Sequence, residues 1–89
     1  MPRLPPSVET SRARAHLGRC LALARERSGQ AQGDVAVALG VSRPTLSAWE
    51  RGLAEPLALD LQRLADLYGV TLDQLVGRAD LPPPPQEDT

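Results

Sequence analysis

Aromatic residues are almost missing from this chain of 89 residues: they make up 2% of it, and phenylalanine does not occur. Leucine, valine and alanine must therefore fill the core. Because β-sheets depend on β-branched and aromatic side chains, this composition favours an all-α fold. The length allows one domain with one small core.

Cysteine and long apolar runs are also scarce. The single cysteine, Cys20, excludes an internal disulfide and is typical of a cytoplasmic protein. No apolar run approaches the ~20 residues of a membrane span, and the first residues lack the apolar centre of a signal peptide. We therefore expect a cytoplasmic protein that has no contact with a membrane.

His16 and Cys20 stand four residues apart, a spacing that would suit two metal ligands on one face of a helix. Structural zinc needs four ligands, and the chain has no other histidine or cysteine. A nucleophilic pair would also need an oxyanion site, which the neighbouring residues do not supply. We therefore expect a surface histidine beside a half-buried thiol, with no metal, no cofactor and no enzymatic activity.

The stretch 32–52 predicts two short helices joined by a tight turn. Gly40 suits the positive φ at the end of the first helix, and Ser42 is a good N-cap for the second helix, 43–51. Apolar residues at helical spacing mark the inner faces of both helices: Val35, Ala36, Leu39, Leu46 and Trp49. This is the plan of a helix-turn-helix, although a hairpin in a small helical bundle would give the same pattern.

Further helices are expected on both sides of this pair. The first, beginning at Thr10 or Ser11 and running to about Ser28, carries Leu17, Leu21 and Ala24 on one face. A fourth is expected at 57–68, with a core face of Leu57, Leu61, Leu64 and Ala65. Thr71 can cap a short fifth helix. Proline-rich ends predict a flexible arm at 1–10 and a disordered acidic tail at 79–89, which leaves 11–78 as the domain.

The net charge of −1 conceals a strong asymmetry. Residues 1–51 carry eight arginines and four acidic residues, a balance of +4, whereas residues 52–89 carry two arginines and seven acidic residues, a balance of −5. The basic half can face phosphate while the acidic half faces solvent or a protein partner. All the basic residues are arginine, which, with the abundance of Ala, Leu, Pro and Gly, suggests a GC-rich bacterial genome.

An ordered set of small, apolar and charged positions supports a more specific interpretation. The runs LGRCLALARERSG, DVAVALGVSRPTLSAWERG and LQRLADLYGVTLDQLVG, with Gln32 between the first two, resemble the lambda-repressor-like family, also called the Cro or xenobiotic-response-element type. The resemblance covers 17–77. It implies a compact five-helix DNA-binding domain in a sequence-specific transcriptional regulator. We expect this regulator to be a repressor that works at the nucleoid. The alternative is a protein-interaction module, or an antitoxin-like partner binder, on the same fold.

For such a regulator, base contacts should come from the outward N-terminal face of helix 43–51. The candidates are Arg43, Pro44, Ser47 and Ala48. Arg43 alone can bind guanine O6 and N7 with two hydrogen bonds. The candidates for phosphate contacts are Gln32, which matches a phosphate-binding position of the family, and Ser42, Thr45 and Arg51. The resemblance also implies a structural ion pair between Arg25 and Glu50.

A module of this size seldom binds DNA tightly alone, so we expect a homodimer on a short inverted repeat. Leu72, Leu75 and Val76 could form the dimer contact or could complete the core. Ala31 and Gly33 depart from the family pattern, since neither a capping side chain nor a strong helix former opens helix 32–39. We expect that helix to begin loosely and to become firmer on binding.

Overall fold

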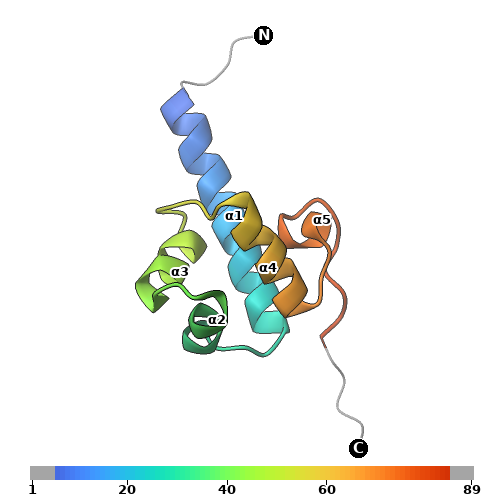
Figure 1. Ribbon diagram of the computed structural model, residues 1–89. Helices are drawn as coiled ribbons and strands as arrows, with labels where there is room; N and C mark the ends of the chain where they lie inside the picture. The colour runs from blue at the N-terminus through green and yellow to red at the C-terminus, as the bar shows by residue number, and fades with distance from the viewer. Residues whose placement is uncertain (1–5, 85–89) are drawn as a thin grey trace, which may run out of the picture.

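The computed structural model describes residues 6–84, which form five α-helices and no strand (Figure 1). This confirms the predicted all-α, five-helix fold. No helix among the described residues has the length and apolar character needed to cross a membrane. The helices are α1 (Pro6–Arg27), α2 (Gln32–Leu39), α3 (Arg43–Glu50), α4 (Ala58–Tyr68) and α5 (Leu72–Leu75).

Helix α1 begins at Pro6, earlier than the Thr10 or Ser11 expected from the sequence. Proline is tolerated in a first helical turn, where its missing N–H would have no partner, and Glu9 suits the positive end of the helix dipole. Residues 6–10, which the sequence analysis assigned to the N-terminal arm, are therefore helical; the rest of that arm, 1–5, lies outside the described residues. The N-terminal half of α1 extends beyond the other helices (Figure 1).

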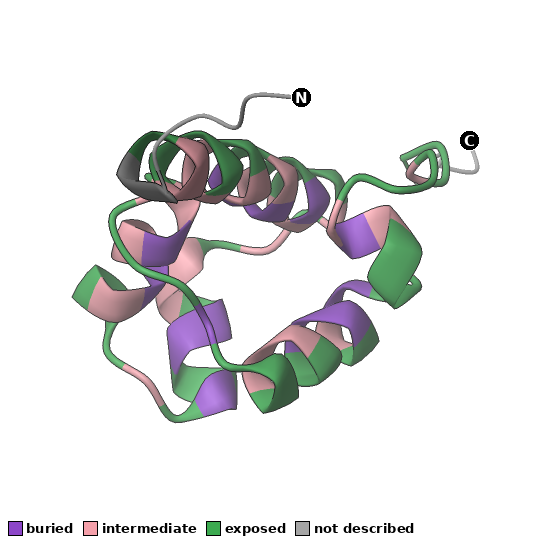
Figure 2. Ribbon diagram, turned by 90° about the horizontal axis from the view of Figure 1, so that it is seen from above, coloured by how far each residue is buried: buried purple, intermediate pink, exposed green. Residues whose placement is uncertain are grey.

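The core lies where the inner faces of the helices meet (Figure 2). All five apolar residues expected to point inward from the α2–α3 pair are buried, and Leu21, Ala24, Leu64 and Ala65 join them. Leu57 was expected in the core, but its side chain is 73% exposed. It precedes α4 as the N-cap residue, where its N–H donates to Asp60 Oδ2 at 3.2 Å.

The chain after α5 contains no helix between residues 79 and 84. We expected a solvated tail from residue 79 onward, but Leu81 is half-buried against the core. The guanidinium of Arg27 in α1 donates from Nη1 to the carbonyl oxygen of Pro82 at 3.3 Å. The first part of the expected tail thus lies along α1, and residues 85–89 are outside the described residues.

Candidate nucleic-acid interface

Helices α2 and α3 are joined by a tight turn at Gly40, whose φ of 74° favours glycine. The amide of Val41 donates to the carbonyl oxygen of Ala36 at 3.0 Å, which closes the end of α2. The side chain of Val41 packs against the core. The turn therefore fixes how α3 leaves α2, as the sequence predicted.

The first turn of α3 is capped by the side chain of Ser42, the residue that precedes the helix. Ser42 Oγ accepts a hydrogen bond from the Thr45 amide at 3.1 Å and lies 2.8 Å from Thr45 Oγ1. Pro44 occupies the first turn without loss of a helical hydrogen bond. The two hydroxyls expected to contact phosphate are thus bonded to each other at the start of α3, and each keeps hydrogen-bonding capacity for a further group.

Candidate residues from both helices line one shallow hollow of about 350 Å³. Arg43 and Pro44 are exposed on the α3 side of the hollow, and Gln32 comes from the first turn of α2. The complete lining is Gln32, Arg43, Pro44, Ser47 and Arg51. The structure thus brings together three candidates for base contacts and two for phosphate contacts; Ala48, half-buried, does not line the hollow.

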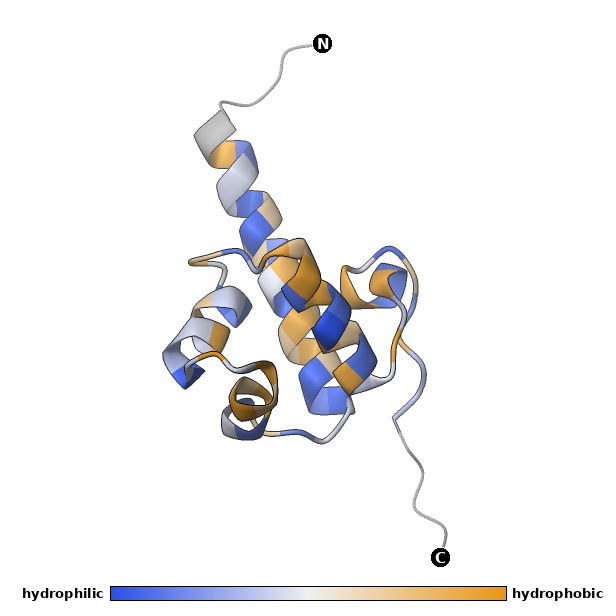
Figure 3. Cartoon of the chain, in the orientation of Figure 1, coloured by the Kyte–Doolittle hydropathy of each residue, from blue (hydrophilic) through white to orange (hydrophobic). Residues whose placement is uncertain are grey.

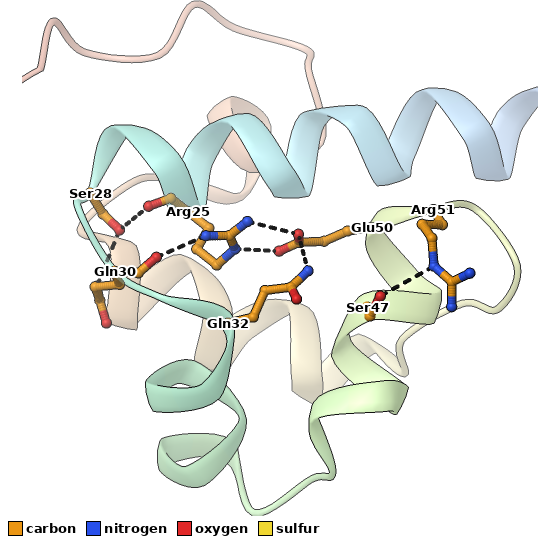
Figure 4. Close-up of polar contacts among 7 residues, drawn as sticks. All are labelled: Arg25, Ser28, Gln30, Gln32, Ser47, Glu50 and Arg51. Carbon is orange, nitrogen blue, oxygen red and sulfur yellow. Dashed lines mark hydrogen bonds and ion pairs between the residues drawn. The ribbon is translucent and has the colours of Figure 1, made fainter.

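Ser47 and Arg51 are linked across one turn at the end of α3 (Figure 4). Arg51 Nε donates to Ser47 Oγ at 3.2 Å. A contact of either side chain with DNA would compete with this hydrogen bond or extend it.

The Arg25–Glu50 ion pair expected from the resemblance is present (Figure 4). Arg25 Nε donates to Glu50 Oε2 at 2.7 Å, and Nη2 donates to Oε1 at 3.1 Å. The side chains of Arg25 and Glu50 are only 14% and 5% exposed. The hydrogen bond to Glu50 raises the pKa of the Arg25 guanidinium above its ordinary value. The pair fastens the end of α3 to α1.

Gln32 belongs to the same network. Its Nε2 donates to Glu50 Oε1 at 2.9 Å, so its amide faces the ion pair (Figure 4). A phosphate contact through the Gln32 side chain would need this bond to be released, whereas the first backbone N–H groups of α2 have no helical partners and remain suited to an anion. Because Glu50 points inward and is neutralised by Arg25, the formal charges lining the hollow are those of Arg43 and Arg51.

Sequence reasoning missed two residues that hold this arrangement in place. A Cβ atom on Gly18 would lie 2.5 Å from the carbonyl oxygen of Glu50, so α1 and α3 can approach only because this residue is glycine. Gln30 Nε2 donates to the carbonyl oxygen of Leu67 at 3.0 Å and joins the α1–α2 link to α4. The sequence did offer a signal for Gly18, which is a glycine inside a helical pattern. It offered no signal for Gln30, because the partner of Gln30 is distant in sequence.

The candidates for a dimer contact differ in how far they are buried. Leu75 is fully buried, which contradicts a direct dimer contact and places it in the core. Val76 is half-buried, and Leu72 is 44% exposed. Cys20 Sγ lies 3.7 Å from His16 Nε2, and the described part of the chain holds no group of three or more residues that could bind a metal.

Comparison with known proteins adds two findings. Residues 16–76 match a family model described as a helix-turn-helix domain. The HTH-type transcriptional regulator ImmR of Bacillus subtilis (strain 168) is 34% identical over 65 residues, which cover 73% of this chain and 51% of the relative. The chain thus spans about half the length of that relative.

Proposed function

The chain belongs to the lambda-repressor-like, Cro-type helix-turn-helix family, and from this premise we propose that it is a sequence-specific regulator of transcription that binds double-stranded DNA and reads the major groove with α3. The observation that carries the proposal is the hollow between α2 and α3, which combines an exposed arginine, an apolar ring and polar side chains on one surface. The name of the Bacillus relative supports the same role.

Arg43 is the principal base-reading residue in this proposal. It stands at the start of α3, is exposed, and has no acidic residue in its helical turn. A guanidinium in that position can donate two hydrogen bonds to guanine O6 and N7, which is worth about 1–3 kcal/mol against a wrong base. Pro44 and Ala48 offer apolar contact to a thymine methyl group, and Ser47 can bond to several bases.

Phosphate contacts would come from residues on both sides of the base-reading surface. Ser42 and Thr45 flank the start of α3, Arg51 follows its end, and Gln32 lies at the start of α2. Neutralisation of Glu50 by Arg25 supports this assignment, because it keeps a carboxylate away from the DNA backbone.

We propose that the chain acts as a homodimer on a short inverted repeat, at the nucleoid in the cytoplasm. A single α3 helix offers one guanine-binding side chain, so two half-sites are needed for useful specificity. Repression is the simplest outcome, since a bound dimer blocks other proteins from the same duplex without a further contact surface.

A protein-interaction module is the second candidate. It is favoured by the exposed acidic residues of the C-terminal half, which include Glu55, Asp66 and Asp73. In this alternative the acidic half binds a protein partner, and α3 has no preference among DNA sequences.

The test is enrichment of duplexes from a random pool, followed by fluorescence-anisotropy titration at two salt concentrations. We expect selected duplexes to bind tightly and to weaken steeply with salt. Arg43→Ala should remove discrimination between selected and scrambled duplexes. Arg63→Ala, which removes an exposed arginine on α4, should retain it. Failure to enrich any sequence would contradict the regulator and favour the interaction module.

A further inference from the structure

Arg43, Ser47 and Arg51 follow one another at intervals of four residues, so they form one stripe along α3 that ends at its C-cap residue. All three line the hollow, with the half-buried Ser47 between the two exposed arginines. Helix α3 is mostly white to blue in Figure 3, the colours of polar residues, whereas α2 is largely orange. The stripe therefore places one neutral hydroxyl between two positive charges on a polar surface.

Two hydrogen bonds join Arg51 to Ser47. The Arg51 amide donates to the Ser47 carbonyl oxygen at 2.9 Å, and Arg51 Nε donates to Ser47 Oγ at 3.2 Å (Figure 4). A guanidinium N–H can only donate, so the direction of the second bond is fixed. Ser47 thus positions both the backbone and the side chain of Arg51, and its hydroxyl oxygen uses one lone pair in doing so.

Both side chains keep hydrogen-bond donors for another molecule. Within residues 6–84, no acceptor bonds to Nη1 or Nη2 of Arg51 or to the hydroxyl hydrogen of Ser47. The Nη groups can donate to a phosphate, while the hydroxyl can donate to a base. Contacts of this kind extend the hydrogen bond between Ser47 and Arg51 and do not require it to break.

The hydrogen bond from Arg51 gives the Ser47 hydroxyl a preferred role. A serine hydroxyl by itself can both donate and accept. A hydroxyl that accepts a hydrogen bond from a cation becomes a stronger donor. A base amino group at its second lone pair would bring positive partial charge next to the guanidinium, which is unfavourable. Ser47 should therefore favour acceptors on the bases over donors.

We propose that Ser47 and Arg51 act as one specificity-determining unit, in which Arg51 binds a phosphate and directs Ser47 toward a hydrogen-bond acceptor in the major groove. The acceptors there are N7 of either purine, guanine O6 and thymine O4, whereas cytosine presents only its amino group. Cytosine is thus the base that this unit excludes at the position that Ser47 contacts. The inference rests on the proposed function and narrows the choice of bases open to Ser47.

The test measures the affinity of selected half-sites in which each base pair is replaced in turn by the other three. At one position, wild type should bind cytosine about tenfold more weakly than the selected base, and Ser47→Ala should tolerate cytosine there. Arg51→Lys keeps the positive charge but has no N–H at the Nε position. It should retain the salt dependence of wild type, and its discrimination against cytosine should fall to about twofold or less. Arg63→Lys, the matched change at an exposed arginine of α4, should alter neither property.

Arg51→Ala separates the proposed unit from an ordinary phosphate contact. A residue that only binds phosphate weakens all sequences nearly uniformly when it is removed, and lowers the salt slope by about 1. Arg51→Ala should lower the slope by that amount and should also relax the preference at the one position that Ser47→Ala relaxes. Thermal unfolding of each variant shows whether it remains folded, as we expect for changes at exposed or half-buried side chains.

Unchanged discrimination against cytosine in Arg51→Lys and Arg51→Ala would overturn the inference. It would also be overturned if Ser47→Ala altered the preference at no position, or if cytosine were the selected base at the position that it alters. In each of these cases wild type still selects a sequence, so the proposed function stands. Failure of wild type to enrich any sequence would instead contradict the proposed function and the inference that rests on it.

Discussion

Helices α2 and α3 have the same length, eight residues each, but they are stabilised differently. Helix α3 has a capping side chain at Ser42 and proline in its first turn. Helix α2 follows Ala31, which makes no capping hydrogen bond. Instead, α2 buries three of its residues, and its first side chain, Gln32, bonds to Glu50 at the end of α3.

The difference shows which helix depends on its neighbours. The start of α3 is specified by residues next to it in sequence, whereas the start of α2 depends on contacts made after the chain has folded. Helix α3 is thus held at both ends, by Ser42 at the start and by the Arg25–Glu50 ion pair at the end. The first turn of α2 has no capping side chain and is held instead by the hydrogen bond from Gln32 to Glu50.

The largest expected effect comes from removing Glu50. Glu50→Ala leaves Arg25 without its acidic partner and Gln32 without its acceptor, so we expect a loss of about 3–5 kcal/mol in the free energy of unfolding. Urea unfolding followed by the fluorescence of the only tryptophan, the buried Trp49, measures it. Glu26→Ala, which removes an exposed acidic residue of α1, is the control. Similar losses in the two variants would contradict an anchoring role for Glu50.

Two glycines provide the next comparison. Gly18→Ala places a methyl group against the α3 backbone and should cost about 1–3 kcal/mol of stability through overpacking. Gly33→Ala in α2 meets no atom within 4 Å and should gain up to about 1 kcal/mol from helix propensity. Thermal unfolding of both variants measures the difference. A stabilising Gly18→Ala would show that close packing of α1 on α3 is unnecessary.

The caps give a smaller effect of opposite sign in the two helices. Ser42→Ala removes the cap of α3 and should cost about 1 kcal/mol, whereas Ala31→Ser supplies one to α2 and should gain up to about 1 kcal/mol. Chemical denaturation of both variants measures the two changes. If Ala31→Ser had no effect, the start of α2 would already be as well stabilised as that of α3.

The parts of the fold that local signals control were predictable from sequence. The turn at Gly40, the cap at Ser42 and the inward residues of both helices follow from spacing and residue type. The predicted start of α1 was wrong, because proline disrupts a helix interior but is also tolerated in a first helical turn, as at Pro6. The predicted burial of Leu57 was also wrong. Its core spacing could not reveal that α4 begins one residue later, at Ala58.

The candidate site was predictable only in part. Residue types identified Arg43 and its neighbours, and the resemblance supplied Arg25–Glu50. The hydrogen bond from Gln32 to Glu50 and the approach of Gly18 to α3 join residues far apart in sequence, which no local pattern encodes. The DNA contacts themselves stay a prediction.

The last effect is absent at neutral pH and is confined to alkaline pH. Burial, and next the charge of Glu50, raises the pKa of Tyr68 above the ordinary 10.0. Tyr68 therefore keeps its proton in the folded chain when the unfolded chain has lost it. Its contribution to stability is full below pH 10.0 and falls as pH rises toward the folded-state pKa, by up to about 1.4 kcal/mol per pH unit. Urea unfolding of wild type and Tyr68→Phe across this range tests it; parallel curves would contradict it.

The most direct test of base reading by α3 replaces each guanine of a selected half-site, one at a time, with 7-deazaguanine, which lacks the N7 acceptor. Anisotropy titration then compares wild type with Arg43→Ala. We expect one position in each half-site to cost wild type about tenfold in affinity and to cost Arg43→Ala nothing. Equal losses in both proteins at every position, or no loss at any, would contradict the reading of the major groove by Arg43.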